Sequence, residues 1–299
     1  MSDNFKSGFV AIIGRPNVGK STLLNRFIGE KVAIVSNKPQ TTRNKIQGIL
    51  TGEDYQIIFI DTPGIHAPKT RLAENMVKTA ESAARGVDII LFMIEPKMKA
   101  NTADIELAEK LLKAKTPVFL VINKTDTVAK PDLLKVIAAY KEHKFAEIVP
   151  MSALKGENAD NLMETIVKYL SRGPRYFPDD AYTDKPERFI VAELIREKAL
   201  FLLQDEIPHG IAVEVTSMKE RANRPLIDIE ATIYCERDSH KGIVIGKHGT
   251  VLKQIGTKAR QDVARLLDCE INLQLWVKVK ENWRDSDFYI RNFGLKQEI

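Results

Sequence analysis

A loop that ends in glycine, lysine and serine lies near the start of the chain. Residues 14–21 read Gly-Arg-Pro-Asn-Val-Gly-Lys-Ser, which fits the pattern G-x-x-x-x-G-K-[ST]. Apolar residues 9–13 precede the loop and apolar residues at helical spacing follow it, which predicts a strand, a loop and a helix. Backbone N–H groups and the positive end of the helix favour an anion there. We therefore expect a nucleoside triphosphate, with Lys20 at its β- and γ-phosphates and Ser21 as a ligand of Mg²⁺. The alternative is an ordinary glycine turn.

A second apolar segment, residues 55–60, runs into the tetrapeptide Asp61-Thr62-Pro63-Gly64. P-loop nucleotide hydrolases hold Mg²⁺ with an acidic residue at the end of a strand, and Asp61 would do so here through water. Gly64 has no side chain, so its backbone N–H can approach the γ-phosphate closely. This segment therefore predicts the metal side of the same site.

Two later segments predict which base is bound. Residues 117–122 read as a strand and lead into Asn123-Lys124-Thr125-Asp126, and the Asp126 carboxylate can accept two hydrogen bonds from guanine but not from adenine. Residues 147–151 lead into Ser152-Ala153-Leu154, where a backbone N–H can reach guanine O6. Each motif alone is weak, because an N-K-x-D sequence is often only a helix cap. All four occur in order, each at the carboxyl end of a predicted strand, and this combination favours guanine.

The elements that position these motifs alternate between strand and helix from residue 8 to residue 170. Residues 46–50 and 55–60 are joined by a short turn, which predicts an antiparallel hairpin at one edge of an otherwise parallel sheet. A helix at 158–170 closes the region. We expect an α/β, three-layer P-loop GTPase domain over residues 1–172, followed by a linker rich in proline, glycine and charge at 173–183.

Residues 184–299 have a different pattern, which predicts an α+β domain. We expect the order α-β-β-α-α-β, with the sequence Gly246-Lys247-His248-Gly249 between the last two helices. A lone G-x-x-G is usually a tight turn. The expected elements are a helix at 187–206, strands at 211–216 and 227–235, a short segment at 241–245, a helix at 250–267 and a strand at 271–279.

Composition limits the classes of function. The 299 residues carry a net charge of +5, with 44% hydrophobic and 28% charged residues, which is typical of about two globular domains. No apolar run reaches the ~18 residues of a transmembrane helix, and no signal peptide is recognisable. Cys235 and Cys269 are far apart, so we expect core cysteines in a reducing cytoplasm.

Charge is uneven in the second half. Residues 181–299 hold as many basic as acidic residues, but the stretch between residues 237 and 265 is basic and contains only Asp238 and Asp262 as acids. This stretch is either a phosphate-binding surface or a solvated helix face. Its basic residues are Arg237, Lys241, Lys247, Lys253, Lys258, Arg260 and Arg265.

The four nucleotide motifs resemble the G1, G3, G4 and G5 motifs of Ras-like GTPases, and the forms GRPNVGKSTLLN and DTPG are similar to the bacterial translation-associated branch. The resemblance implies a switch I threonine that binds Mg²⁺ and the γ-phosphate, which we assign to Thr42 with Thr41 as the alternative. It gives catalytic roles to Lys20, Thr42 and Gly64. The nucleotide-binding residues that it implies are Gly14, Asn17, Val18, Gly19, Lys20, Ser21, Thr22, Asp61, Gly64, Asn123, Lys124, Asp126, Ser152, Ala153 and Leu154.

Three further residues bear on hydrolysis. Asn17 matches the asparagine that ligates K⁺ in potassium-stimulated relatives, although an asparagine is also common in turns. Ile65 stands where many Ras-like enzymes carry a water-orienting glutamine, so we expect slow intrinsic hydrolysis. We expect Arg15 to be a solvated loop residue, with an arginine finger as the alternative.

The second domain resembles a KH domain of the prokaryotic type, type II. The glycines of its loop let the backbone approach RNA phosphates, and a helix and the sheet form a groove for single-stranded RNA. We expect RNA to contact Gly246, Lys247, His248, Gly249 and Lys253.

A Ras-like GTPase followed by one KH domain looks like the Era family of bacterial GTPases, and the resemblance covers essentially the whole chain. It implies a monomeric switch using GTP, GDP and Mg²⁺ that binds the 3′ end of 16S rRNA and acts in assembly of the 30S subunit. It also implies a cytoplasmic location with peripheral membrane association. The alternatives are a nucleotide-gated RNA-binding module with incidental turnover, and a membrane-associated signalling GTPase linked to cell cycle control.

Overall fold

The computed structural model describes residues 4–36, 38, 41–64, 70–97 and 101–295. These form two compact units, one made of residues 1–33, 42–67 and 76–184, the other of residues 34–41, 68–75 and 185–299. Among the described residues, no helix combines the length and apolar character needed to cross a bilayer. Ile65 and Gln40, which adjoin the expected switch residues, lie outside the described part of the chain.

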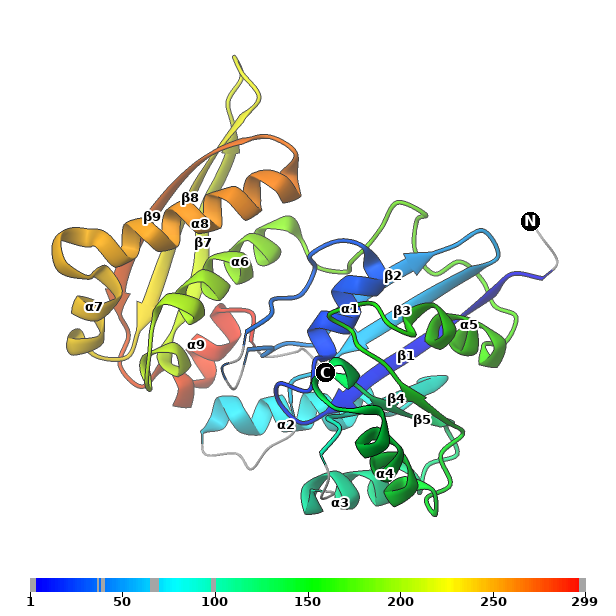
Figure 1. Ribbon diagram of the computed structural model, residues 1–299. Helices are drawn as coiled ribbons and strands as arrows, with labels where there is room; N and C mark the ends of the chain where they lie inside the picture. Colours follow the sequence, from blue (N-terminus) through cyan, green and yellow to red (C-terminus); the bar gives the residue numbers. More distant parts are fainter. Residues whose placement is uncertain (1–3, 37, 39–40, 65–69, 98–100, 296–299) are drawn as a thin grey trace. The chain divides into compact units, whose positions relative to one another are not determined.

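The first unit is built on a six-stranded sheet with the order β2-β3-β1-β4-β5-β6 (Figure 1). β2 and β3 pair antiparallel through the expected hairpin, and the other neighbouring strands are parallel. The strands are β1 (Lys6–Gly14), β2 (Ile46–Thr51), β3 (Tyr55–Asp61), β4 (Ile89–Ile94), β5 (Val118–Ile122) and β6 (Glu147–Pro150). The carboxyl ends of β1, β3, β5 and β6 therefore lie along one edge, where the four motifs begin.

Helices pack on both faces of this sheet, which confirms the three-layer prediction. On one face, Ala83, Ala108 and Val136 from three helices share a core with Ala11 and Ile13 of β1. On the other face, the rings of Phe27 and Phe59 stack 5.1 Å apart and those of Tyr169 and Phe119 meet edge to face at 4.8 Å. The helices are α1 (Lys20–Ile28), α2 (Arg71–Ala83), α3 (Thr102–Leu111), α4 (Lys130–Tyr140) and α5 (Ala159–Tyr169).

The segment expected to be a linker packs on the first unit. Gln56 of β3 is fully buried, and its side-chain oxygen accepts hydrogen bonds from the backbone N–H groups of Tyr176 and Phe177 at 2.7 and 3.0 Å. Thr183 then forms a bridge with Gly48 of β2. This segment is therefore not a free spacer, because Tyr176, Phe177 and Thr183 are held by hydrogen bonds to the strands of the first unit.

The second unit has the expected element order, with three strands in the order β7-β8-β9. β7 and β8 are antiparallel, whereas β8 and β9 are parallel. The elements are α6 (Glu187–Leu202), β7 (Ala212–Glu220), β8 (Leu226–Cys235), α7 (Asp238–Ile245), α8 (Thr250–Leu267), β9 (Glu270–Val279) and α9 (Asp287–Asn292). α6 ends four residues before the predicted end, and a 3₁₀ turn that contains Pro208 follows at Ile207–Gly210. The helix ends where Leu203 takes an extended conformation, with φ −98° and ψ 150°.

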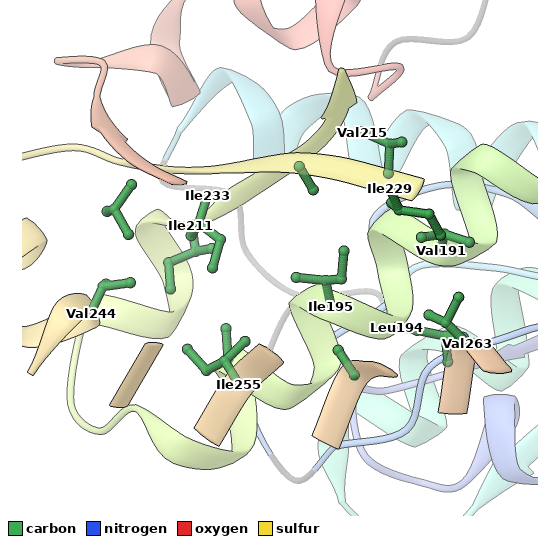
Figure 2. Close-up of a cluster of buried hydrophobic side chains, with 14 of the residues drawn as sticks. Val191, Leu194, Ile195, Ile211, Val215, Ile229, Ile233, Val244, Ile255 and Val263 are labelled. Atoms are coloured by element: carbon green, nitrogen blue, oxygen red, sulfur yellow. The ribbon is translucent and has the colours of Figure 1, made fainter. Parts of the chain in front are cut away.

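Aliphatic side chains from α6, α8 and the inner face of the sheet form the core of the second unit. Figure 2 shows Val191 and Ile195 of α6 packed with Ile229 of β8 and Ile255 and Val263 of α8. The prediction for the cysteines is confirmed, because both are free, Cys235 is buried in this core, and Cys269 packs against it.

The outer face of the same sheet is partly covered by α9, which the sequence pattern did not predict. The ring of Phe293 lies 4.9 Å from that of Tyr234 on β8, and the buried Trp283 donates a hydrogen bond to the carbonyl of Gly210 at 2.9 Å. The segment from Trp283 to Phe293 is therefore anchored to the sheet.

Candidate nucleotide site and nucleic-acid interface

The glycine-rich loop connects β1 to α1 as predicted. Gly19 has φ +104°, and a Cβ on it would lie 2.1 Å from Nδ2 of Asn123, so only glycine fits there. Asn17 is left-handed with φ +65°, and Thr22 lies in the first turn of α1. The Val18 carbonyl accepts a hydrogen bond from Nδ2 of Asn123 at 2.7 Å. The loop is thus held from behind by the motif that is expected to read the base.

Lys20 is buried at the start of α1. Its Nζ donates hydrogen bonds to the carbonyls of Gly14 and Arg15 at 3.0 and 2.9 Å. Burial lowers the pKa of the Lys20 amine to about 8, because desolvation penalises the charged form. A phosphate beside this amine would stabilise its charged form, so its environment suits an anionic ligand.

Three oxygen-bearing side chains meet beside Lys20. Ser21 Oγ donates a hydrogen bond to Asp61 Oδ2 at 2.6 Å and lies 2.9 Å from Thr42 Oγ1. Asp61 is fully buried, its Oδ1 atom has no hydrogen-bond partner among the described residues, and burial raises the pKa of its carboxyl. Carboxylate and hydroxyl oxygens are the donors that Mg²⁺ prefers, and a buried unpaired carboxylate oxygen suits a cation or its water ligand. The residues therefore fit the expected metal.

The structure distinguishes the two switch I threonines. Thr42 Oγ1 faces Ser21, whereas Thr41 Oγ1 donates to the carbonyl of Lys38 at 2.6 Å. Gly64 lies against the glycine-rich loop, since a Cβ on it would come within 2.6 Å of the Pro16 nitrogen. The geometry favours Thr42 as the metal ligand and brings Gly64 to the phosphate side of the site.

The two base-side motifs meet around Asn123. Its Oδ1 accepts a hydrogen bond from the backbone N–H of Ala153 at 2.8 Å, and Ser152 Oγ donates to Asp126 Oδ1 at 2.6 Å. Lys124 is left-handed with φ +66°, and its amine pairs with Glu95 at the end of β4. One constellation therefore joins the glycine-rich loop, the Asp126 carboxylate and the turn at residues 152–154.

Arg15 corrects one expectation. Its guanidinium forms a two-point ion pair with Asp104 of α3, with Nε at 2.6 Å from Oδ1 and Nη2 at 2.9 Å from Oδ2, and the Asp104 side chain is 4% exposed. Arg15 is therefore neither a solvated loop residue nor a free arginine finger. Instead it ties the glycine-rich loop to α3.

Three residues that the sequence motifs did not indicate also support the site: Asp104, Glu95 and Arg26. Arg26 of α1 donates hydrogen bonds to the carbonyls of Ala153 and Leu154. None belongs to a recognisable motif. The only signal available was that Glu95 directly follows an apolar strand, as Asp61 does.

In the second unit, the glycine loop forms the sharp connection between α7 and α8. Gly246, His248 and Gly249 all have positive φ, at +74°, +54° and +76°. Lys247 and His248 are exposed at the tip. The N–H of Gly249 donates to the Gly246 carbonyl at 3.1 Å, which closes the turn and presents the side chains of Lys247 and His248 to solvent.

A groove of about 440 Å³ begins at this loop and runs between α8 and β9. Leu252, Leu273 and Leu275 give it an apolar floor, and Gly256 leaves it hollow. Lys253 and Arg260 stand exposed along it, whereas the lining does not include Lys258. Apolar surface for bases beside cations for phosphates is the combination that single-stranded RNA needs.

α6 carries a buried charged cluster that reaches two segments of the second unit. Glu197 Oε1 accepts a hydrogen bond from the Val35 N–H at 2.9 Å, and Arg196 donates to the Thr41 carbonyl. Lys198, which follows Glu197 in α6, forms an ion pair with Asp262 of α8. Val35 and Thr41, the latter directly before Thr42, are thus hydrogen-bonded to the helix that packs against α8.

Comparisons with known proteins agree with both sites. Residues 9–124 match the family model described as 50S ribosome-binding GTPase, and residues 206–284 match the KH domain model. The chain is 58% identical to GTPase Era of Clostridioides difficile, covering 97% of this chain and 98% of that protein. It is 55% identical to GTPase Era of Clostridium acetobutylicum, covering 98% of each.

Two solved structures cover the chain over 98% of its length with a TM-score of 0.94. One is a single-residue variant of Aquifex aeolicus Era bound to GDP.AlF4-, at 42% identity, covering all of that chain. The other is Era in complex with MgGDPNP and nucleotides 1506–1542 of 16S ribosomal RNA, at 43% identity, also covering all of that chain. With these relatives and this geometry, the chain belongs to the Era family of GTPases.

Proposed function

We propose that this protein is a GTP-hydrolysing switch that binds the 3′ end of 16S rRNA through its KH groove and acts in assembly of the 30S subunit. One observation carries the proposal: a phosphate-binding loop with a metal-ligand set and a cationic, apolar-floored groove occur in a single chain. An Era protein of the same fold has been solved with MgGDPNP and a 16S rRNA segment bound together.

On the nucleotide side, buried Lys20 and Asp61 support the proposal. Burial lowers the pKa of the amine and raises that of the carboxyl. The charged form of each group is therefore destabilised until a bound ligand supplies the opposite charge. Bound Mg²⁺ would supply charge neutralisation at the β- and γ-phosphates, held by Ser21, Thr42 and, through water, Asp61. Asp126 would accept the guanine donors.

We also propose two features of GTP turnover. Slow intrinsic hydrolysis is expected from Ile65, which cannot orient water by hydrogen bonding. Potassium should raise turnover above that in sodium at equal ionic strength if Asn17 is a K⁺ ligand, and equal rates would remove that role.

On the RNA side, the glycine loop would hold backbone phosphates while bases enter the groove over Leu273 and Leu275. Affinity should come largely from the cations that neutralise phosphates, and base choice from the groove. The hydrogen bonds of Val35 and Thr41 to α6 support a route by which nucleotide state biases this groove, because the adjoining Thr42 would be ordered by the γ-phosphate.

The test is titration of labelled RNA with the sequence of the 16S rRNA 3′ end, using a matched pair of variants. Lys253→Asp and Lys258→Asp change the same charge on the same helix, but only Lys253 lines the groove. We expect Lys253→Asp to weaken RNA binding by at least tenfold and to reduce its salt dependence, with a much smaller effect for Lys258→Asp.

The double variant Lys247→Asp, His248→Asp tests the loop itself. It should also weaken RNA binding at least tenfold, since two carboxylates would face phosphates, and GTP affinity should not change. Unchanged RNA affinity in a variant shown by circular dichroism to be folded would mean that the loop is only a turn. Equal losses of RNA affinity for Lys253→Asp and Lys258→Asp would mean that the groove makes no specific contribution to RNA binding.

We also propose that the protein works in the cytoplasm, where GTP and ribosomal subunits occur, with peripheral membrane association as in the family. The readout is cell fractionation: the protein should sediment with 30S particles, and a membrane-bound fraction should be released by salt without detergent. Retention in the membrane fraction with no ribosomal association would favour the signalling alternative.

A further inference from the structure

The turn that is expected to read guanine is held by a side chain outside the recognised motifs. Arg26, in the last turn of α1, donates from Nε to the Ala153 carbonyl at 2.5 Å and from Nη2 to the Leu154 carbonyl at 2.8 Å. The guanidinium also lies against Gly156, where a Cβ would come within 2.6 Å of Nη1. The planar fork of arginine therefore spans two successive carbonyls of this turn.

Holding these carbonyls also orients the amides of the turn. A peptide is planar and trans, so fixing the C=O of one residue fixes the direction of the N–H of the next. The Ala153 carbonyl shares its plane with the N–H of Leu154, and the Leu154 carbonyl with that of Lys155. Arg26 thus acts on the backbone of the turn from the α1 side.

The opposite side of the turn is held by the guanine motif. Asn123 Oδ1 accepts from the Ala153 N–H at 2.8 Å, and Ser152 Oγ donates to Asp126 at 2.6 Å. Ser152 and Ala153 are buried, whereas Leu154 is 70% exposed and so gains little support from packing. The two arginine hydrogen bonds therefore act where the turn leaves the protein interior.

We propose that Arg26 is a positioning residue for guanine: it holds the turn at residues 152–154 so that a backbone N–H meets O6 of the base. This rests on the proposed binding of guanine nucleotides. Arg26 does not touch the nucleotide in this scheme, and its two hydrogen bonds go to Ala153 and Leu154 and not to Asp126.

The experiment compares three diphosphates that differ at single positions of the base. In 6-thio-GDP, a sulfur atom replaces O6 and is a weaker hydrogen-bond acceptor. The two groups of the base that donate to Asp126, N1–H and the exocyclic amine, remain. IDP lacks only the exocyclic amine, which reports on Asp126. Dissociation constants of GDP, 6-thio-GDP and IDP are measured with Mg²⁺ for the wild type, Arg26→Gln and Arg26→Lys. The control is Arg85→Gln, because Arg85 is an exposed arginine elsewhere in the first unit.

For Arg26→Gln, we expect the affinity for GDP to fall about tenfold, because two charged hydrogen bonds to the turn are lost. The ratio of the 6-thio-GDP constant to the GDP constant should fall towards one, while the ratio for IDP stays at the wild-type value. Arg26→Lys should lie between, since one ammonium cannot span two carbonyls as a guanidinium does. Arg85→Gln should match the wild type.

A purely structural role would weaken all three ligands equally and leave both ratios unchanged, which would overturn the proposal. If Arg26→Gln does not fold, as judged by circular dichroism, the ratios of Arg26→Lys decide the matter in the same way. Failure of the proposed function looks different: the wild type itself would then bind GDP no better than 6-thio-GDP, IDP and ADP.

Discussion

Replacing Lys20 by methionine should stabilise the nucleotide-free protein while abolishing its response to nucleotide. The Lys20 pKa is lowered by burial from 10.5 to about 8 in the folded state. At pH 7 this difference corresponds to a folding penalty of about 3 kcal/mol. Methionine has a similar length and no charge, so Lys20→Met should raise the free energy of unfolding by an amount that approaches this value.

The pH dependence of this effect has a definite sign. Since the folded pKa of Lys20 lies below the unfolded one, the unfolded state binds more protons between about pH 8 and pH 10.5. The contribution of Lys20 to stability is therefore most unfavourable below pH 8 and improves as the pH rises through this window. At pH 9.5 the wild type should have regained about 2 kcal/mol, so its difference from the variant should shrink to about 1 kcal/mol.

The assay is urea unfolding at pH 7 and pH 9.5, in EDTA without nucleotide and again with GDP and Mg²⁺. GDP at a thousandfold excess over its dissociation constant should stabilise the wild type by about 4 kcal/mol and the variant hardly at all. Lys135→Met is the control, because that lysine side chain is 64% exposed and should change stability by less than about 0.5 kcal/mol.

Two results would refute this reasoning about Lys20. One is a Lys20→Met variant that is less stable than the wild type at pH 7 without nucleotide. In that case the hydrogen bonds from Lys20 to the carbonyls of Gly14 and Arg15 would stabilise the fold by more than removal of the amine from water destabilises it. If the difference did not change between pH 7 and pH 9.5, the amine would not be titrating in this window.

Three further predictions concern the two sites. Asp126→Asn should shift base preference from guanine towards xanthine nucleotides, and fluorescent-analogue competition that still favours GTP would contradict the assigned role. Thr42→Ala should weaken Mg²⁺-dependent GTP binding and lower turnover at least tenfold, whereas Thr41→Ala should leave both within about twofold of the wild type. A larger loss in Thr41→Ala than in Thr42→Ala would mean that Thr41 is the metal ligand. Gly249→Ala, with φ +76° and open space around its Cβ, should cost about 1–2 kcal/mol of stability. Gly246→Ala should cost more in the same thermal melts, because its Cβ would also come within 2.9 Å of a backbone nitrogen.

Much of the fold could be predicted because its signals are local. Parallel strands buried on both faces read as short apolar runs, and each nucleotide motif directly follows such a run. The alternation from residue 227 to residue 235 likewise predicted β8, found at Leu226–Cys235. α9 was missed because its six residues are too few to show a helical period. Its position depends instead on contacts with Tyr234 and Trp283.

The supporting residues of the nucleotide site could not be predicted, for a related reason. Arg26 and Ala153 are 127 positions apart, and Arg15 and Asp104 are 89 apart, so no local pattern joins them. The motifs lie at the carboxyl ends of strands, where the parallel sheet brings them together whatever the intervening sequence. Arg26 and Asp104 project from helices, on which a charged residue usually marks only a solvated face. A sequence read alone therefore indicates which groups would touch the nucleotide, while the groups that hold them in place emerge only when helix and loop are seen together.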